Sequence, residues 1–248
     1  MCSPSTCPTP DPAARGVRLP YKSAVTAPTT LSTSIGDFPL HEYQLSLGGR
    51  TWSFLHTGSV VTVEQEQAYL QRERDRLPYG AMLWPSSIAL AHDLFARADG
   101  LPGRRVLELG AGTGLPGIVA ASLGAEVLQI DRNEVALHLC KRNAQRNATA
   151  RLEVHAVDWE TFHAAEPFDV ICGADVLYAA TMHDRLRAIC DEHLAPGGRV
   201  LFADPLRSES LRLLEAMEQT GYRVSLAKWA IGVESGTRTI AIYEASRT

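Results

Sequence analysis

The stretch that decides the fold is VLELGAGTGLP, residues 106–116, in which an apolar run leads into three alternating glycines. The apolar run predicts a buried strand. Pro116, near the start of the next apolar run, favours the first turn of a helix, where its missing N–H costs nothing. Glycines adopt torsions closed to other residues and let a ligand approach the main chain. Such a loop at the carboxyl end of a strand is typical of ligand sites in doubly wound sheets.

Strand and helix patterns alternate on both sides of this block. We expect strands at 105–109, 126–130, 152–157, 169–172 and 199–203, and helices at 86–98, 115–123, 133–147, 181–194 and 208–220. The last two strands, 222–229 and 238–244, have no helix between them and should form an antiparallel pair. The sequence therefore predicts an α/β fold with a doubly wound, seven-stranded mixed sheet whose last strand is antiparallel.

The N-terminal third differs from the rest of the chain. Residues 1–34 are rich in Pro, Ser and Thr and hold no aliphatic run that could form a core, which predicts a disordered tail. Residues 35–80 are expected to form an extension, with a β-hairpin turning at Gly48-Gly49 and a charged helix over 62–77. Residues 81–248 should form the main domain.

Charge and composition exclude several classes of protein. The 248 residues carry a net charge of −4, which argues against a broad electrostatic grip on nucleic acid. No run approaches the roughly 20 apolar residues of a membrane span. The five cysteines show no C-x-x-C spacing, so neither a disulfide framework nor a zinc site is indicated, and a reducing compartment, the cytoplasm, is expected. The eight histidines form no metal-binding pattern, and we expect no metal.

The glycine block has two possible ligands. Residues 112–117 match G-x-G-x-x-G, the dinucleotide fingerprint, but the acidic Glu108 lies two residues before the loop and would oppose an anionic pyrophosphate. S-adenosylmethionine, which carries a sulfonium and an ammonium group, fits that acid better. Asp131 lies 19 residues after Gly112, where an acid can accept both ribose hydroxyls. Asp131 could instead serve only as an acid at a helix N-terminus.

These residues carry a resemblance to a known family. The sequence resembles class I S-adenosylmethionine-dependent methyltransferases, which have a Rossmann-like fold, and within them methyltransferase family 16, which holds protein-lysine methyltransferases. The resemblance covers roughly residues 43–244. It rests on the following blocks: YGAMLWPSS (79–87), VLELGAGTGLPGI (106–118), GAEV (124–127), Asp158-Trp159 and ADVLY (174–178).

The resemblance implies a role for each matched residue. Asp131 would take the ribose, while Asp158 and Trp159 would frame the adenine. The residues implied to contact the rest of the cofactor, mostly its methionine end, are Trp84, Glu108, Gly110, Ala111, Gly112, Gly114 and Ala174. Other readings stay open: Trp84 could be plain core and Asp158 a turn residue.

The D-x-x-Y segment, Asp175 to Tyr178, follows a buried strand that should lie beside the glycine-loop strand. In family 16 this motif lies where methyl donor and acceptor meet, so Asp175 and Tyr178 are the candidate catalytic residues. Methyl transfer from a sulfonium mainly needs alignment, potentially worth about 7–11 kcal/mol. A lysine amine must first shed a proton, which a carboxylate alone would oppose. Asp175 is therefore expected to orient the amine, or alternatively only to cap its loop.

The sequence thus predicts a methyltransferase (EC 2.1.1 type) that uses S-adenosylmethionine and methylates a protein nitrogen, with lysine favoured. We expect a protein substrate and neither a nucleic acid nor a membrane partner, and the oligomeric state stays open. The alternatives are an enzyme that methylates a small-molecule amine, an NAD-dependent oxidoreductase and a non-catalytic adaptor.

Overall fold

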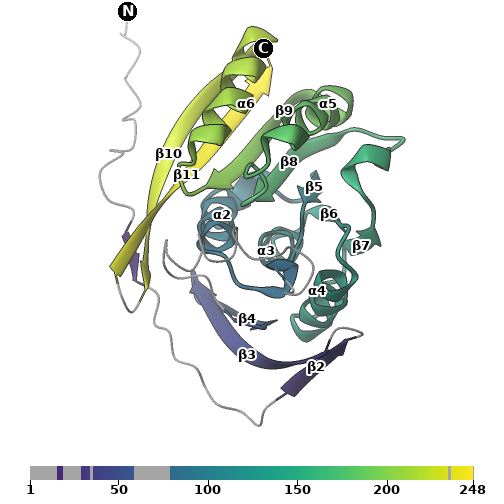
Figure 1. Cartoon of the computed structure of the whole chain (residues 1–248), viewed down its shortest axis with the longest axis vertical. Coiled ribbons are helices and arrows are strands. Elements are labelled where there is room, and N and C mark those ends of the chain that lie inside the picture. Colours follow the sequence, from purple (N-terminus) through teal and green to yellow (C-terminus); the bar gives the residue numbers. More distant parts are fainter. Residues whose placement is uncertain (1–15, 19–28, 34–35, 59–78, 234–235, 248) are drawn as a thin grey trace, which may run out of the picture.

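The computed structural model describes residues 16–18, 29–33, 36–58, 79–233 and 236–247. An eight-stranded sheet runs through the molecule in the order β1-β10-β11-β9-β8-β5-β6-β7 (Figure 1). Its strands are β1 (Gly16–Arg18), β5 (Arg105–Leu109), β6 (Glu126–Asp131), β7 (Leu152–Ala156), β8 (Phe168–Ala174), β9 (Leu194–Asp204), β10 (Tyr222–Val233) and β11 (Gly236–Arg247). The seven predicted strands are all present, and β1 is an eighth.

The direction of each strand follows from its connection. Strands β5 to β9 are joined through helical segments and pair in parallel, whereas β11 pairs antiparallel with both β9 and β10. The predicted mixed sheet with an antiparallel last strand is confirmed. The order also places β8 beside β5, as expected, so that the carboxyl ends of these strands lie at one edge.

Helices cover both faces of the sheet and enclose two apolar cores. The longer helices are α2 (Pro85–Ala96), α3 (Leu115–Ser122), α4 (Glu134–Arg146), α5 (His183–His193) and α6 (Ser208–Gln219). Helices α2 and α3 share a core with one face of the sheet, and α5 and α6 share a core with the other. The sequence predicts these helices within a few residues; α4, for example, begins one residue later because Asn133 is its N-cap and accepts from Ala136 N–H.

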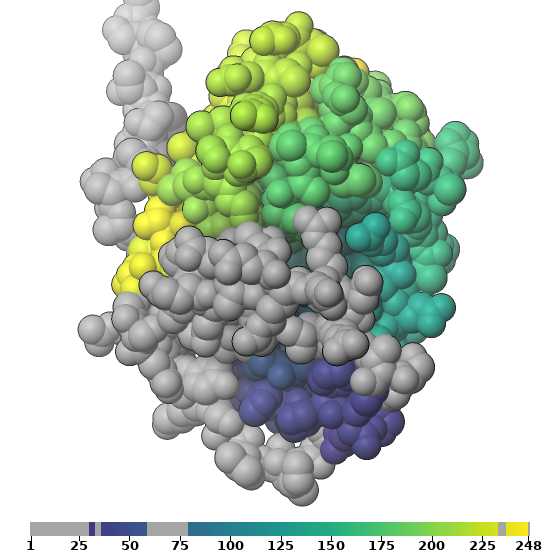
Figure 2. Space-filling view, viewed as in Figure 1, coloured from purple at the N-terminus to yellow at the C-terminus, as the bar shows by residue number. Residues whose placement is uncertain are grey.

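The N-terminal extension is a second, smaller sheet. Strands β3 (Gly36–Leu47) and β4 (Arg50–His56) form the predicted hairpin, with Gly48 and Gly49 at positive φ in the turn. A third strand, β2 (Thr29–Thr33), pairs with β3. Figure 1 shows this sheet at the end of the molecule opposite α6, and Figure 2 shows the same arrangement in space-filling form. The predicted charged helix over 62–77 lies outside the described residues.

The predicted disordered tail is wrong at two places. Residues 16–18 form β1 and pair in parallel with β10, and residues 29–33 form β2. Composition could not predict this because each segment is a strand through its backbone pairing with a strand elsewhere in the chain, β1 with β10 and β2 with β3. The rest of residues 1–34 lies outside the described part of the chain.

No helix in the described ranges combines the length and the apolar character needed to cross a bilayer.

Candidate functional site

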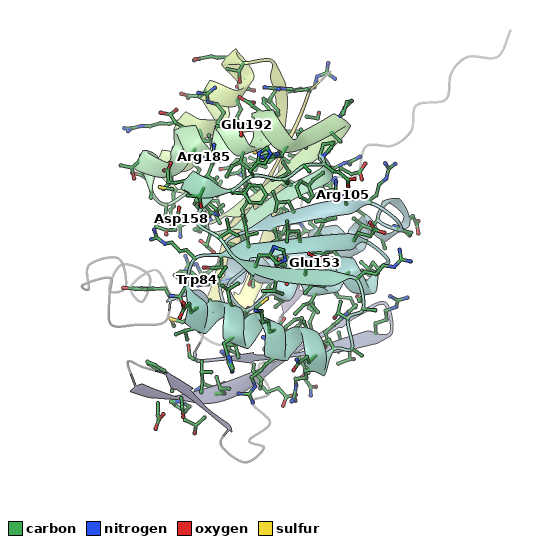
Figure 3. All side chains as sticks on the ribbon, turned by 90° about the vertical axis from the view of Figure 1, so that its right-hand side faces the viewer. Trp84, Arg105, Glu153, Asp158, Arg185 and Glu192 are labelled. Atoms are coloured by element: carbon green, nitrogen blue, oxygen red, sulfur yellow. The ribbon has the colours of Figure 1, made fainter. Side chains whose placement is uncertain are left out.

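The candidate site lies at the carboxyl edge of the parallel strands. The glycine loop follows β5, Asp131 ends β6, Asp158 follows β7, and the D-x-x-Y segment follows β8. Figure 3 shows Trp84 and Asp158 on one side of the molecule and Glu153, near the start of β7, toward the other. The topology therefore gathers at one edge residues that are up to 68 positions apart, from Gly110 to Tyr178.

The glycine loop turns at three positions whose backbone torsions favour glycine. Gly110, Gly112 and Gly114 have φ values of 68°, 54° and 82°, in the left-handed region that other residues rarely adopt. The N–H groups of Gly110 and Ala111 both donate to the Ile130 carbonyl, at 2.9 and 3.0 Å. The loop is thus fastened to the end of β6, and the identity of its glycines follows from the backbone torsions.

Gly110 is the point where three parts of the site meet. The position that a Cβ would occupy on Gly110 lies 2.9 Å from Val176 Cγ1 of the D-x-x-Y segment and 3.5 Å from Trp159 Cζ2. Three parts of the site therefore lie close together. They are Gly110, implied to contact the methionine end, Trp159, implied to frame the adenine, and the D-x-x-Y segment, implied to meet the acceptor. Spacing in the sequence could not show this.

Asp131 is well placed to hold a polar ligand beside the loop. Its Oδ2 accepts from Gly112 N–H at 3.0 Å and its Oδ1 from Asn133 N–H at 2.8 Å. Burial raises the pKa of this carboxyl, and the hydrogen bonds from the backbone oppose that rise. The Arg132 backbone is a third donor to this carboxylate. A carboxylate has about four lone-pair directions, so the backbone leaves part of its accepting capacity for a ligand. This geometry fits the predicted hydrogen bonds to a ribose diol.

Glu108 has a different position from the one implied by the resemblance. Its side chain on β5 is buried, with only 1% of the residue exposed, and its Oε2 accepts from Gly117 N–H at 2.9 Å and from the Gln129 side-chain amide. Burial raises its pKa to about 8. The carboxyl therefore supports the start of α3 beneath the loop, and its side chain is engaged by the protein itself. Gln129, which also donates to the Gly114 carbonyl, is a supporting residue that the sequence did not indicate.

Asp158 and Trp159 lie where a purine could be held. Asp158 caps the short helix η3 (Trp159–Thr161) by accepting from Glu160 N–H at 3.0 Å, as the turn reading predicts. The half-buried Trp159 packs against the core beneath α5, and its carbonyl accepts from Arg185 at 2.7 Å. Both readings of Asp158 are compatible with this arrangement, because its second oxygen faces only Arg132, at 3.9 Å.

Trp84 belongs to a segment that borders the glycine loop. It is half-buried at the start of α2, and its indole N–H donates to the Tyr79 carbonyl at 3.1 Å. The position of a Cβ on Gly112 would lie 3.0 Å from the Gly80 carbonyl oxygen. The segment from Tyr79 to Trp84 therefore passes against the loop at Gly80, and the indole of Trp84 is hydrogen-bonded to the first residue of that segment.

Of the two polar side chains of the D-x-x-Y segment, one is buried and the other is exposed. Ala174 ends β8, and Asp175 follows it with a φ of 56° and a side chain that is only 9% exposed. Tyr178 is 43% exposed. Burial raises the pKa of Asp175, and the neighbouring Arg207 and Ser86 oppose that rise. The carboxylate that the sequence analysis expects to orient the amine, or only to cap its loop, is thus buried and ion-paired with Arg207.

The sequence analysis missed two residues that contact Asp175 or lie beside it. Arg207 donates to Asp175 Oδ1 at 2.7 Å and to Asp204 Oδ2 at 2.7 Å. Asp204 ends β9 and is fully buried. An acid at the end of a strand, like Asp131, was a signal that could have indicated Asp204, whereas nothing in the pattern indicated Arg207.

The described residues contain no cluster of three or more His, Cys, Asp or Glu side chains that could hold a metal ion.

Comparison with known proteins gives the chain its family. The model of the family described as "Lysine methyltransferase" matches residues 64–220. The mouse "Histone-arginine methyltransferase METTL23" is 38% identical over 106 residues, which is 40% of this chain and 42% of that protein. The mouse "Protein N-lysine methyltransferase METTL21A" is 38% identical over 141 residues, 53% of this chain and 63% of that protein. The match thus spans about half the length of the METTL23 relatives.

Solved structures agree on the fold. The Thermus thermophilus 16S rRNA methyltransferase RsmC, in complex with AdoMet and guanosine, has a TM-score of 0.59 at 19% identity and aligns with 84% of this chain and 51% of that chain. The Synechocystis magnesium protoporphyrin IX methyltransferase, with bound SAM, has a TM-score of 0.54 at 18% identity, with 76% and 86% covered. At such identities these structures show the fold alone, and the predicted Rossmann-like class is confirmed. Since the family model covers well over half of its residues, the chain belongs to the lysine methyltransferase family.

Proposed function

We propose that this protein transfers a methyl group from S-adenosylmethionine to a nitrogen of a protein side chain, with lysine as the favoured acceptor. The observation that carries the proposal is the meeting at Gly110 of the glycine loop, Trp159 and the D-x-x-Y segment. A donor held by the loop would thereby lie beside the segment that faces an acceptor. Membership of the lysine methyltransferase family supports the same reading.

The residues at the loop fit S-adenosylmethionine better than a dinucleotide. The Gly112 N–H, which a pyrophosphate could use as a donor, already donates to Asp131 Oδ2. An anionic pyrophosphate beside the Asp131 carboxylate would be repelled, whereas the cationic end of S-adenosylmethionine would be attracted. Asp131 would hold the ribose, the glycine loop the methionine end, and Trp159 with Asp158 the adenine.

The chemistry asks the protein mainly for alignment. S-adenosylmethionine, when bound, supplies a methyl group that is already activated by its sulfonium. The chain must then orient the acceptor amine in its neutral form and exclude water. Tyr178, whose side chain is 43% exposed, can contact the acceptor directly. Asp175 is committed to Arg207 and contributes by holding the loop that carries Tyr178.

The acceptor has two candidates. Lysine is favoured because the family model and METTL21A carry lysine in their names, as does the mouse EEF1A lysine methyltransferase 3, which is 30% identical over 148 residues. Arginine is the second candidate, because METTL23 relatives named as histone-arginine methyltransferases match at 33–38% identity. A protein acceptor follows from both groups of relatives. We also propose a cytoplasmic location, supported by three free, buried cysteines: Cys140, Cys172 and Cys190.

Isothermal titration tests the cofactor. We expect S-adenosylmethionine to bind and NAD not to bind. Asp131→Asn should weaken S-adenosylmethionine binding about tenfold or more, because a charge-assisted hydrogen bond to the ribose is lost. Asp184→Asn, an exposed aspartate of α5, is the matched control and should bind like the wild type. Tight binding of NAD without S-adenosylmethionine would indicate an oxidoreductase.

Mass spectrometry of a lysate incubated with the protein and isotopically labelled cofactor tests the acceptor. We expect labelled methyl groups on lysine side chains of a small number of proteins. Label on arginine would replace the favoured acceptor with the second candidate. Label on small amines alone, or none despite proven cofactor binding, would indicate a small-molecule enzyme or an adaptor.

A further inference from the structure

Two loops at neighbouring strand ends are joined by one arginine. Strands β8 and β9 are parallel neighbours, with Ala174 paired to Ala203, so Asp175 and Asp204 follow at the same level of the sheet. Asp175 N–H donates to the Ala203 carbonyl at 2.9 Å. Arg207 then reaches both acids, with Nη2 at 2.7 Å from Asp175 Oδ1 and Nη1 at 2.7 Å from Asp204 Oδ2.

This bridge is almost removed from solvent. The exposed fractions of the side chains are 13% for Arg207, 9% for Asp175 and 0% for Asp204. The Arg207 N–H also donates to Asp204 Oδ1 at 2.7 Å, so Asp204 holds the arginine by backbone and side chain together. A buried guanidinium that bridges two carboxylates is fixed by both of them, and breaking such a buried pair by removing one partner is costly. The two loops are therefore held in a fixed relation.

Both loops contain a residue with an unfavourable backbone. Asp175 has a φ of 56° and Leu206 a φ of 66°, and neither is a glycine. Such conformations are uncommon outside glycine and persist only where the surroundings enforce them. Because Arg207 contacts Asp175 and directly follows Leu206, it is the side chain that connects the two strained residues.

We infer that Arg207 is a positioning residue, which acts through Asp175 to hold the Asp175–Tyr178 loop in place for the methyl acceptor. This inference rests on the proposed function for its catalytic meaning and deepens it, because it assigns Asp175 to the fixing of the loop and leaves contact with the acceptor to Tyr178. The carboxylate oxygen that accepts from Arg207 is not free to accept a proton from the amine.

The test compares Arg207→Ala and Arg207→Lys with a matched control, Arg212→Ala. Arg212 is an exposed arginine five residues further on, in α6. We expect Arg207→Ala to lower kcat for the protein acceptor about ten- to a hundredfold, as a displacement near 1 Å can, while the Kd for S-adenosylmethionine changes less than about twofold. Arg207→Lys keeps the charge but cannot bridge both acids, and should be intermediate. A wild-type kcat in Arg207→Ala would overturn the inference.

A double-mutant cycle tests whether Arg207 acts through Asp175. If it does, Asp175→Ala with Arg207→Ala should lower kcat no further than the worse single variant. Multiplying effects in the double variant would mean that the two residues act separately, and the inference would fail.

Hydrogen exchange separates this inference from the proposed function. Amides of residues 175–178 should exchange faster in Arg207→Ala and Arg207→Lys than in Arg212→Ala, since the Asp175 N–H bond to Ala203 loses its support. If the wild type methylates no acceptor, the proposed function fails, and the exchange result still decides whether Arg207 holds the loop. Unchanged exchange in both Arg207 variants would reject the bridge as the element that positions it.

Discussion

At the scale of single residues, the burial of Glu108 should make the stability of the protein depend on pH. Its carboxyl is buried beneath the glycine loop and its pKa is raised from 4.5 to about 8. In the folded protein it therefore keeps a proton that the unfolded chain releases near pH 4.5. The folded state binds more protons between these values, so the Glu108 contribution makes the free energy of unfolding fall as pH rises from about 4.5 to about 8.

We predict that Glu108→Gln removes this pH dependence. Glutamine does not titrate, and its carbonyl can accept from Gly117 N–H and Gln129 as the carboxyl does. Relative to the variant, the wild type should lose a few kcal/mol of stability between pH 5 and pH 8, at roughly 1.4 kcal/mol per unit of pKa shift. Urea unfolding across that range measures the difference. Glu215→Gln, an exposed glutamate of α6, is the control, and parallel curves for Glu108→Gln and wild type would contradict the prediction.

The residue scale also shows where sequence reasoning stops. Spacing placed Glu108, Asp131 and Asp175 correctly at one edge of the sheet, because strand ends follow from apolar runs and turns. The partners of these side chains come from elsewhere in the chain: Gln129 lies on the next strand and Arg207 is 32 positions from Asp175. A carboxylate that is free in the sequence pattern can thus be fully engaged in the fold, and no local signal reports it.

At the scale of elements, Asn143 fastens the N-terminal hairpin to the site. This fully buried side chain of α4 accepts from Leu55 N–H at 2.8 Å and donates to the Leu55 carbonyl at 3.0 Å, as a neighbouring strand would. It also donates to the Thr113 carbonyl of the glycine loop at 2.9 Å. One amide therefore joins β4, α4 and the loop.

We predict that Asn143→Ala lowers the free energy of unfolding by about 2–4 kcal/mol, because buried backbone groups of Leu55 and Thr113 lose their partner. Binding of S-adenosylmethionine should weaken as well, since the loop loses one support. Chemical unfolding and calorimetry measure the two effects. Gln145→Ala, an exposed residue two positions away on α4, should leave both unchanged. A normal cofactor affinity in Asn143→Ala would show that the hairpin does not influence the loop.

Helices and strands were predictable where the spacing of apolar residues or a turn defines their limits. Leu115 to Ser122 and Arg105 to Leu109 were found within a residue, because a glycine loop and Pro116 mark their limits. Strands β1 and β2 were not found, because they are defined by pairing with β10 and β3 across the sheets. Strand β9 also begins at Leu194, five residues before its predicted start, because Phe168 of β8 pairs with Leu194.

At the scale of the whole molecule, the extension and the main domain share one core. Tyr43, Leu45, Trp52 and Phe54 of the hairpin are buried in the same apolar cluster as α2, α3 and one face of the sheet. Trp52 stacks edge-on against Phe95 of α2, with ring centroids 6.1 Å apart, and donates to the Ser122 hydroxyl at 3.0 Å. The hairpin has therefore little apolar surface of its own to hold it together once these contacts are lost.

We predict that the hairpin and the central sheet unfold as one unit. Phe54→Ala should lower the free energy of unfolding by about 3–5 kcal/mol, because the removed ring leaves a cavity in the shared core. Hydrogen exchange at increasing urea should then show β4 and the central strands β5 and β8 losing protection together, at a lower urea concentration than in the wild type. Leu226→Ala, on the exposed side of β10, is the control. It should change neither the free energy of unfolding nor the urea concentration at which these strands lose protection. Loss of protection in β4 alone would mean that the extension is a separate folding unit. The glycine loop would in that case depend on the hairpin only through Asn143, and not through the core they share.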